Sequence, residues 1–394
     1  MGLHGARVPW PAVPREVVRA SKPYVGFRAL LPFGIGVGVA CAALGATADA
    51  PTVTALSAIA MDAETGRVLF EKDADAIRYP ASTTKVMTAL LMIEGLDHQK
   101  WYAAPKEVET VTGSSLYMKP GERLRGYDLI QAVMLRSAND AAVTGAVHIS
   151  GSVEKFCQLM NERAKALGCE NTHFNNPHGL NDDLHTTTAR DLALITREAI
   201  KNPLFNKLAR MQRTTIERPE NPQDAVLVSK NHWLRQEPTA DGIKTGYTDP
   251  AGRCFIGSAT RNGFRVITVV LKSEDTWADT AALTDWCFDQ YRVANLGEQG
   301  KVVTAESGAR VELLQSVRTL VGAQDDWEAD FVEPSGGEPY VRFVARDGWA
   351  VRVAARKQPQ MMAGMGSPTT WALVALLVGG AYAMRRKSRR ISLP

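Results

Sequence analysis

The feature that most constrains this chain is a Ser-x-x-Lys motif placed directly before a long apolar run. Ser82 and Lys85 lie three residues apart, and the apolar residues behind them are Val86, Met87, Ala89, Leu90, Leu91, Met92 and Ile93. Such a run predicts a buried helix, and Pro80, which is tolerated just before a helix but not inside one, indicates a start near Ser82. Ser82 then lies at the positive end of the helix, and Lys85 lies one turn along the same face. The hydroxyl and the amine can therefore meet.

This spacing suits nucleophilic catalysis. A serine hydroxyl is a weak nucleophile until a neighbouring base accepts its proton. A lysine can be that base only when burial or other cations lower its pKa, and the apolar run offers burial. The alternative is a serine that caps the helix beside a surface lysine, so the motif is informative only together with partner motifs.

Two partner motifs occur downstream. Ser137-Ala138-Asn139 follows a predicted helix at 127–134, and Lys244-Thr245-Gly246 lies on a predicted strand and its turn at 241–248. Each motif is weak alone. Three of them in this order, each in a suitable structural context, form a strong signal.

Both ends of the chain indicate export and membrane attachment. Basic residues up to Arg28, an apolar stretch at 29–45 and small residues at 46–50 predict a signal peptide at 1–50 that is removed in the mature protein; a buried core helix is the alternative. The nearly unbroken apolar run at 371–384 predicts a C-terminal transmembrane anchor at 361–384, with an interfacial helix as the alternative. The basic tail at 385–394 is then cytoplasmic, and the folded part lies on the extracytoplasmic, periplasmic face of the cell membrane.

Composition excludes some classes of function. The formal net charge of +4 is small for 394 residues, and much of it comes from the basic tail, so we expect no nucleic-acid-binding domain. The cysteines outside the signal peptide show no metal-ligand spacing, and we expect them to be buried free thiols, although an exported protein can also oxidise them. These cysteines are Cys157, Cys169, Cys254 and Cys287.

The pattern between the two ends predicts two folded parts. Strand patterns at 55–71, 254–259 and 264–272, the last two joined by Asn262-Gly263, alternate with helical segments, and a helix at 278–293 closes a catalytic domain at 51–296. From 297 to 360 short alternating segments are broken by Pro and Gly, which predicts a small β-rich domain.

With its motifs in place, the chain resembles the penicillin-binding proteins and serine β-lactamases, and most closely the low-molecular-mass D-alanyl-D-alanine carboxypeptidases. The resemblance covers about 55–293 and includes the segments 62–66, 137–142, 172–175 and 244–248. It implies an α+β fold of the β-lactamase/transpeptidase-like type, an antiparallel sheet flanked by helices, followed by the small C-terminal β-rich domain.

The resemblance also implies the roles of the site residues. Ser82 is the nucleophile, Lys85 its base and Ser137 the group that passes a proton to the leaving amine. The substrate-binding residues are Asn139, Lys244, Thr245, Gly246 and Tyr247. The backbone N–H groups of Ser82 and Tyr247 form the oxyanion hole.

The implied reaction removes the terminal D-alanine from peptidoglycan stem pentapeptides through an acyl-enzyme, with β-lactam antibiotics as inhibitors and no metal or organic cofactor. Arg190 and Arg253 are secondary candidates for the substrate carboxylate, whereas His178 and His185 are expected to be structural because Lys85 already fills the role of the base.

Three alternatives stay open. A D,D-endopeptidase or a weak β-lactamase would use the same chemistry, and a catalytically poor, membrane-tethered muropeptide-binding protein would use none. A class A β-lactamase needs a Glu followed by Leu-Asn for deacylation, but Glu170 is followed by Asn171-Thr172-His173. An intact nucleophile and base argue against a pure binding protein, which needs neither.

Overall fold

The computed structural model describes residues 50–305, 308–322, 327–335, 337–345 and 348–358. The predicted signal peptide, apart from its last residue, and the predicted anchor and basic tail lie outside these residues. Within the described part of the chain, no helix is both long enough and apolar enough to cross a membrane.

The Lys244 motif lies on a five-stranded antiparallel sheet in the order β2-β1-β9-β8-β7. The strands are β1 (Ser57–Asp62), β2 (Val68–Lys72), β7 (Ala240–Thr248), β8 (Gly252–Arg261) and β9 (Phe264–Ser273). Asn262 and Gly263 both have positive φ, +51° and +77°, as the tight hairpin predicted between β8 and β9 requires. Strand β7, which carries the Lys244 motif, lies at one edge of the sheet.

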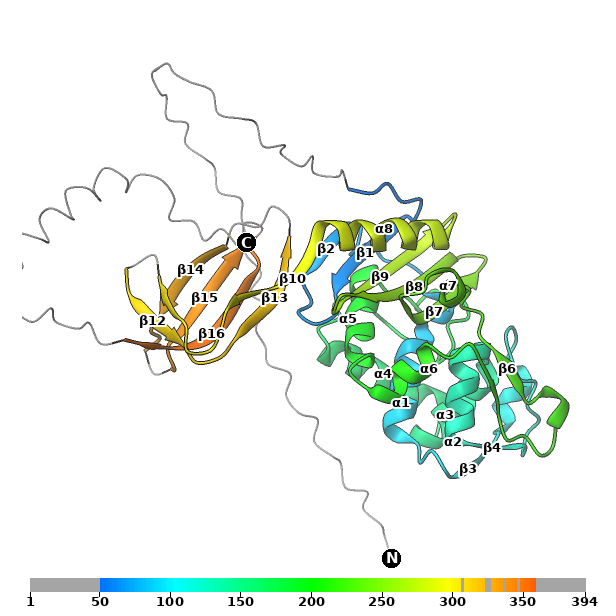
Figure 1. Cartoon of the computed structure of the whole chain (residues 1–394). Coiled ribbons are helices and arrows are strands. Elements are labelled where there is room, and N and C mark those ends of the chain that lie inside the picture. The colour runs from blue at the N-terminus through cyan, green and yellow to red at the C-terminus, as the bar shows by residue number, and fades with distance from the viewer. Residues whose placement is uncertain (1–49, 306–307, 323–326, 336, 346–347, 359–394) are drawn as a thin grey trace, which may run out of the picture. The chain divides into compact units, whose positions relative to one another are not determined.

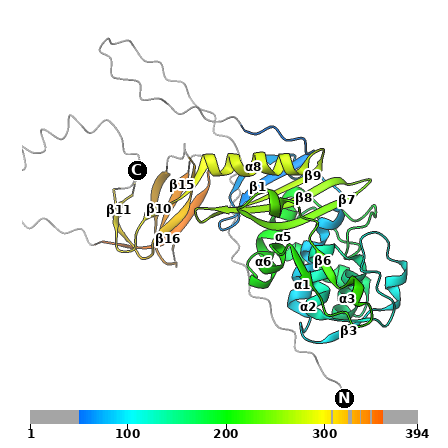
Figure 2. The same cartoon turned by 45° about the vertical axis from the view of Figure 1, so that its right-hand side comes forward.

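Helices cover both faces of this sheet (Figures 1 and 2). Helix α8 (Thr276–Gln290) packs against β9, β8 and β1, and α5 (Ala189–Ala199) contacts β9 and β1 from the opposite face. Asp275 caps α8 by accepting from the backbone N–H groups of Trp277 and Ala278. The helix ends at Gln290 rather than at residue 293, because the next residues form β10 (Tyr291–Gly297), which pairs with β13 (Val317–Gly322).

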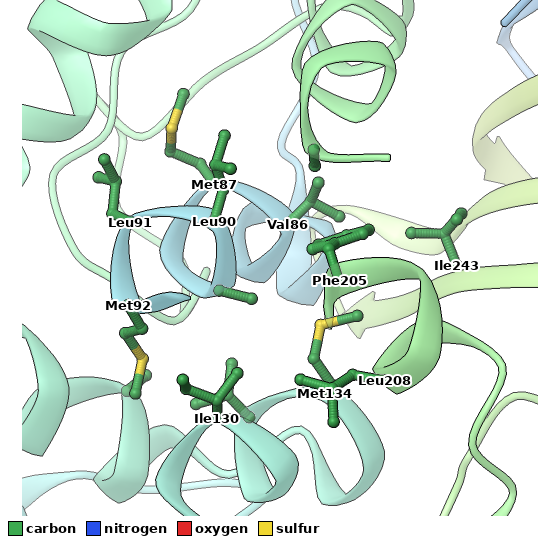
Figure 3. Close-up of a cluster of buried hydrophobic side chains, with 14 of the residues drawn as sticks. Val86, Met87, Leu90, Leu91, Met92, Ile130, Met134, Phe205, Leu208 and Ile243 are labelled. Carbon is green, nitrogen blue, oxygen red and sulfur yellow. The ribbon is translucent and has the colours of Figure 1, made fainter. Parts of the chain in front are cut away.

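The helix behind Ser82 lies in the centre of the helical layer. A 3₁₀ turn, η1 (Ala81–Thr84), leads into α1 (Lys85–Gly95), and every residue of α1 from Lys85 to Ile93 is buried. Figure 3 shows its apolar side chains meeting Ile130, Met134 and Phe205 from neighbouring helices. The predicted buried helix is confirmed, and its burial fixes the position of the motif at its start.

The remaining elements of this part connect the helices or flank them. They are β3 (Trp101–Ala103), η2 (Lys106–Thr110), β4 (Arg123–Arg125), α2 (Gly126–Gln131), η3 (Ala132–Arg136), α3 (Asn139–Ser150), α4 (Val153–Ala166), α6 (Pro203–Ala209), β5 (Arg213–Thr215), η4 (Pro222–Asp224), β6 (Val226–Val228) and α7 (Trp233–Gln236).

The C-terminal part is built from strands. A second five-stranded sheet has the order β11-β12-β16-β15-β14, formed by β11 (Val302–Thr304), β12 (Arg310–Leu313), β14 (Trp327–Val332), β15 (Tyr340–Ala345) and β16 (Ala350–Lys357). Trp327, Phe343 and Val311 lie in its core. The predicted β-rich character is confirmed, while the division of the chain into domains at 296 stays a prediction.

Candidate active site

Ser82 lies in the 3₁₀ turn η1 and Lys85 is the first residue of α1. Nζ of Lys85 lies 3.0 Å from Oγ of Ser82, so the predicted meeting of hydroxyl and amine is confirmed. Gly179 packs directly against this turn and has a positive φ of +84°. There is no space for a side chain at this position, because a Cβ would lie 1.8 Å from the carbonyl oxygen of Ala81.

The amine of Lys85 is surrounded by acceptors and is fully buried. Besides Ser82, it donates to Oδ1 of Asn139 at 2.7 Å and to the backbone carbonyl of His178 at 2.6 Å. Burial lowers the pKa of Lys85 well below its usual value, and the nearby charges of Lys244 and Lys230 lower that pKa further. Lys85 therefore loses its proton more readily than an exposed lysine, which favours its acceptance of the proton of Ser82.

Ser137 is presented by strained backbone. Residues 132–136 form a π-helical turn, and Ser137 itself has φ +61° and ψ +36°, the left-handed region. Non-glycine residues are held in this region where the surrounding structure fixes them, often at functional sites. Here the conformation places Oγ of Ser137 3.1 Å from Nζ of Lys244, from which it accepts a hydrogen bond.

Asn139 begins α3 and orients Lys85. Its Oδ1 accepts from the lysine amine, while its Nδ2 donates to the carbonyl of Thr112 at 2.6 Å. The two contacts together fix which way the side-chain amide points. Asn139, which was expected to bind substrate, therefore also orients Lys85.

Lys244 is fully buried on strand β7. It donates to Ser137 and to the carbonyl of Thr245 at 3.0 Å. Burial, with a smaller contribution from the charge of Lys230, lowers the pKa of Lys244 to about 7. Lys244 thus keeps a positive charge on the acidic side of neutrality.

Gly246 brings strand β7 against the nucleophile turn. A Cβ on Gly246 would lie 3.0 Å from the backbone nitrogen of Ser82 and 3.1 Å from that of Thr83. Gly246 was expected to bind substrate, and in the structure its close neighbour is the Ser82 turn. The next residue, Tyr247, has an exposed side chain whose hydroxyl donates to Asp249. Strand β7 thus passes close to the Ser82 turn at Gly246, the residue before Tyr247.

The two secondary candidates for binding the substrate carboxylate, Arg190 and Arg253, both have other partners in the structure. Arg190 forms ion pairs with Asp75 and Glu71, so its charge is already used. Arg253 lies opposite Tyr247 on strand β8 and donates to the carbonyl of Glu274.

His178 and His185 contribute hydrogen bonds to the structure around the active site. Nδ1 of His185 accepts from the backbone N–H of Asn175 at 2.9 Å, so Nε2 carries the proton and donates to Oγ1 of Thr84 at 2.8 Å. Burial lowers the pKa of His185 to about 4 and that of His178 to about 3. Both side chains are neutral at working pH, which fits the structural role expected for them.

Several groups that contact the active-site residues were not predicted from the sequence. The backbone carbonyl of His178 accepts from Lys85, but a backbone group cannot be recognised from the residue type. Lys230 carries no motif, yet its Nζ donates to Oγ of Ser114 at 2.6 Å and its charge acts on both catalytic-site lysines. Asp140 holds the loop next to the site by accepting from the backbone N–H groups of Leu116 and Met118. Its position beside Asn139 was the only available indication.

Residues 45–275 match a family model described as D-alanyl-D-alanine carboxypeptidase, peptidase family S11. The chain belongs to this family. It is 34% identical over 257 residues to the D-alanyl-D-alanine carboxypeptidase DacF of Bacillus subtilis, a match that covers 63% of this chain and 66% of that one. It is also 34% identical over 275 residues to DacA of Escherichia coli K12, covering 65% of this chain and 66% of the relative. The chain thus spans 66% of the length of each of these curated relatives.

Solved structures agree on the fold. Penicillin binding protein 5 from Haemophilus influenzae superposes with a TM-score of 0.65 at 24% identity, covering 78% of this chain and 96% of that one. A penicillin-binding protein homologue from Mycobacterium tuberculosis gives a TM-score of 0.58 at 30% identity, covering 62% of this chain and 95% of its own. The expected transpeptidase-like α+β fold is confirmed.

Proposed function

We propose that this protein is a serine-type D-alanyl-D-alanine carboxypeptidase that removes the terminal D-alanine from peptidoglycan stem pentapeptides. The observation that carries the proposal is the contact of 3.0 Å between the Ser82 hydroxyl and a fully buried lysine amine. Membership of the D-alanyl-D-alanine carboxypeptidase family supports the same substrate class.

The reaction begins at Ser82. With Lys85 neutral, the Ser82 hydroxyl donates its hydrogen bond to the amine, and Oγ attacks the carbonyl carbon of the penultimate D-alanine while Lys85 takes the proton. The negative oxygen that forms is stabilised by the backbone N–H groups of Ser82 and Tyr247. The close approach of Gly246 to the Ser82 turn supports this pairing.

Collapse of this intermediate breaks the peptide C–N bond. The proton on Lys85 returns to the leaving nitrogen, with Ser137 as the relay. The terminal D-alanine leaves, and the acyl-ester stays on Ser82. Water then attacks the ester with Lys85 again accepting a proton, which releases the tetrapeptide and restores the Ser82 hydroxyl.

Lys244 and Thr245 would recognise the free carboxylate that ends the substrate. An ammonium–carboxylate contact in a partly desolvated cleft is a charge-assisted hydrogen bond, and Lys244 can carry the charge. A β-lactam also presents a carboxylate beside a strained amide, so it would acylate Ser82 as the peptide does.

The location of the enzyme is part of the proposal. The catalytic part would lie outside the cytoplasmic membrane, held by the segment at 361–384, where its substrate occurs. Protease added to spheroplasts should digest the catalytic part. If that part stays protected while an external control protein is cut, the proposed orientation is wrong.

One experiment separates the proposed activity from its alternatives. The purified full chain is incubated with a fluorescent penicillin, with a stem pentapeptide and with a cross-linked muropeptide dimer. We expect a covalent penicillin adduct and release of D-alanine from the pentapeptide. Cleavage of the dimer alone would indicate a D,D-endopeptidase, rapid release of opened penicillin a β-lactamase, and binding without any adduct a muropeptide-binding protein.

A further inference from the structure

The residue directly before the nucleophile has an unusual backbone conformation. Ala81 is buried and has a φ of +49°, in the left-handed region. A residue with a Cβ adopts this region at a cost of about 1–3 kcal/mol, and it stays there only where neighbouring groups hold it. The position of the Ser82 turn therefore depends on the groups that hold Ala81.

One of these groups is the side chain of Thr84, which leads on to His185. Oγ1 of Thr84 donates to the carbonyl of Ala81 at 2.9 Å. Because a hydroxyl has a single hydrogen, Thr84 accepts from Nε2 of His185 at 2.8 Å. On the opposite edge of the ring, Nδ1 accepts from the backbone N–H groups of Asn175 and Asn176 at 2.9 and 3.3 Å. Both edges of the ring thus assign the same tautomer, with the proton on Nε2.

Packing fixes the orientation of this ring. His185 is 1% exposed and packs edge-on against buried Phe174, with ring centroids 5.6 Å apart. Asn161 holds the backbone of Phe174 from both sides, because it accepts from its N–H at 2.7 Å and donates to its carbonyl at 2.9 Å. The N–H of His185 itself donates to the carbonyl of Asp182 at 2.9 Å. Nε2 is therefore held toward Thr84.

The ring also keeps one protonation state over the neutral pH range. Burial lowers the pKa of His185 to about 4. Of the charged groups that act on it, Asp182 raises this pKa, whereas His173 and Lys85 lower it. His178 is a further titratable neighbour, and burial lowers its pKa to about 3. Nδ1 of His185 thus stays an acceptor while the pH changes around neutrality.

We propose that His185 is a positioning residue for the nucleophile. It holds Thr84, Thr84 holds the carbonyl of Ala81, and this chain of hydrogen bonds keeps the Ser82 turn in place. His185 acts through Thr84 and exchanges no proton with the reacting groups. The alternative is that His185 only packs its own loop. That loop also reaches Lys85 through the carbonyl of His178, so the test has to separate the two routes.

The inference rests on the proposed function, and its test measures the rate of penicillin acylation of the full chain. His185→Asn places an amide oxygen close to the position of Nδ1, so it keeps the acceptor for Asn175 and loses the donor to Thr84. His185→Gln places an amide nitrogen close to Nε2 and keeps that donor. His185→Asn should acylate about tenfold more slowly, as expected for a displaced nucleophile, whereas His185→Gln should keep at least about half of the wild-type rate. Equal rates in the two variants would overturn the inference.

A second pair of variants tests the other end of the contact. Thr84→Val removes the hydroxyl at nearly constant size and should slow acylation about as much as His185→Asn does. Thr84→Ser keeps the hydroxyl and should retain most of the rate. Because both residues act along one route, adding His185→Asn to Thr84→Val should slow acylation no further. Losses that multiply in the double variant would show that His185 acts by another route. If His185→Asn does not fold, equal rates in Thr84→Val and Thr84→Ser would overturn the inference.

The pH profile separates the route through Thr84 from the route through Lys85. A displaced nucleophile lowers the rate by the same factor at every pH, so the midpoint of the rising limb should be the same in His185→Asn and the wild type. A shifted midpoint would mean that the His178 carbonyl has moved away from Lys85, and it would overturn the inference.

A control variant removes a histidine contact outside the site. His148 donates to the carbonyl of Ala103 at 2.8 Å and lies near the end of α3, about 13 Å along the helix axis from Asn139. His148→Asn should acylate at the wild-type rate. A wild type that is not acylated at all would reject the proposed function, whereas a wild type that is acylated no faster than His185→Asn would reject the role of His185 alone.

Discussion

Nζ of Lys244 lies 3.1 Å from Oγ of Ser137, so a buried amine on the edge strand donates to the hydroxyl of the loop between two helices. The other buried amine, that of Lys85, contacts Ser82. The charge of Lys244 lowers the pKa of Lys85. One lysine can therefore stay charged for recognition while the other is neutral and acts as the base.

The first prediction concerns the nucleophile. Ser82→Ala should abolish covalent labelling by penicillin, because Ser82 supplies the hydroxyl that contacts Lys85 and no other described residue does so. Intact-mass analysis should show one adduct on the wild type and none on the variant. Ser152→Ala serves as the control, since Ser152 caps α4; it should lose about 1 kcal/mol of stability and keep the adduct. An adduct that persists on Ser82→Ala would reject the assignment.

The second prediction concerns pH. At low pH both amines are protonated and there is no base, so kcat/KM should rise with pH as Lys85, whose pKa is lowered by burial and by the charge of Lys244, loses its proton. Above pH about 7 Lys244 loses its proton as well, and recognition of the carboxylate weakens. A peptide ending in D-Ala-D-Ala should therefore give a bell-shaped profile.

A C-terminally amidated peptide tests the cause of the falling limb. It has no carboxylate to recognise, so its rate should rise with pH and then stay level. A falling limb of equal size for both peptides would mean that Lys244 acts in the chemical step and not in recognition.

The third prediction concerns the size of the Lys244 contribution. Lys244→Gln should lower kcat/KM for a D-Ala-D-Ala peptide by about one to two powers of ten, from the loss of a charge-assisted hydrogen bond of about 1.5–3 kcal/mol. The loss can be larger, because removal of this cation also raises the pKa of Lys85. The amidated peptide should lose much less. Equal losses would show that Lys244 acts through Lys85 alone.

The sequence was sufficient to predict the residues whose chemistry depends on spacing. Ser82 and Lys85 meet because three residues make one helical turn, and the apolar run behind them predicted the burial that lowers the pKa of the lysine. The Asn262-Gly263 hairpin was predicted because few other residue pairs adopt its two positive φ angles.

Features set by tertiary contacts were beyond the sequence. Tyr291 was placed in the last helix because it continues the apolar pattern, but pairing with β13 makes it the start of a strand. The backbone carbonyl of His178 approaches Lys85 from 93 positions along the chain, and no residue type marks such a contact. The left-handed backbone conformation of Tyr117, with φ +58°, could not be predicted from the sequence either, because tyrosine does not favour it.

The last prediction compares two glycines with almost the same backbone. Gly179 has φ +84° and Gly168 has φ +85°, so replacement by alanine strains both by about 1 kcal/mol. A Cβ at 168 meets open space, whereas at 179 it lies 1.8 Å from the carbonyl oxygen of Ala81, the residue before Ser82. Gly168→Ala should lower Tm by a few degrees, about 2–4 °C, with normal penicillin acylation. Gly179→Ala should lower Tm further and slow acylation by at least about tenfold, because a displaced Ala81 moves the nucleophile and misplacement of about 1 Å is that costly. If the two variants acylate equally fast, Gly179 does not position Ser82, and its close contact serves only the packing of the loop.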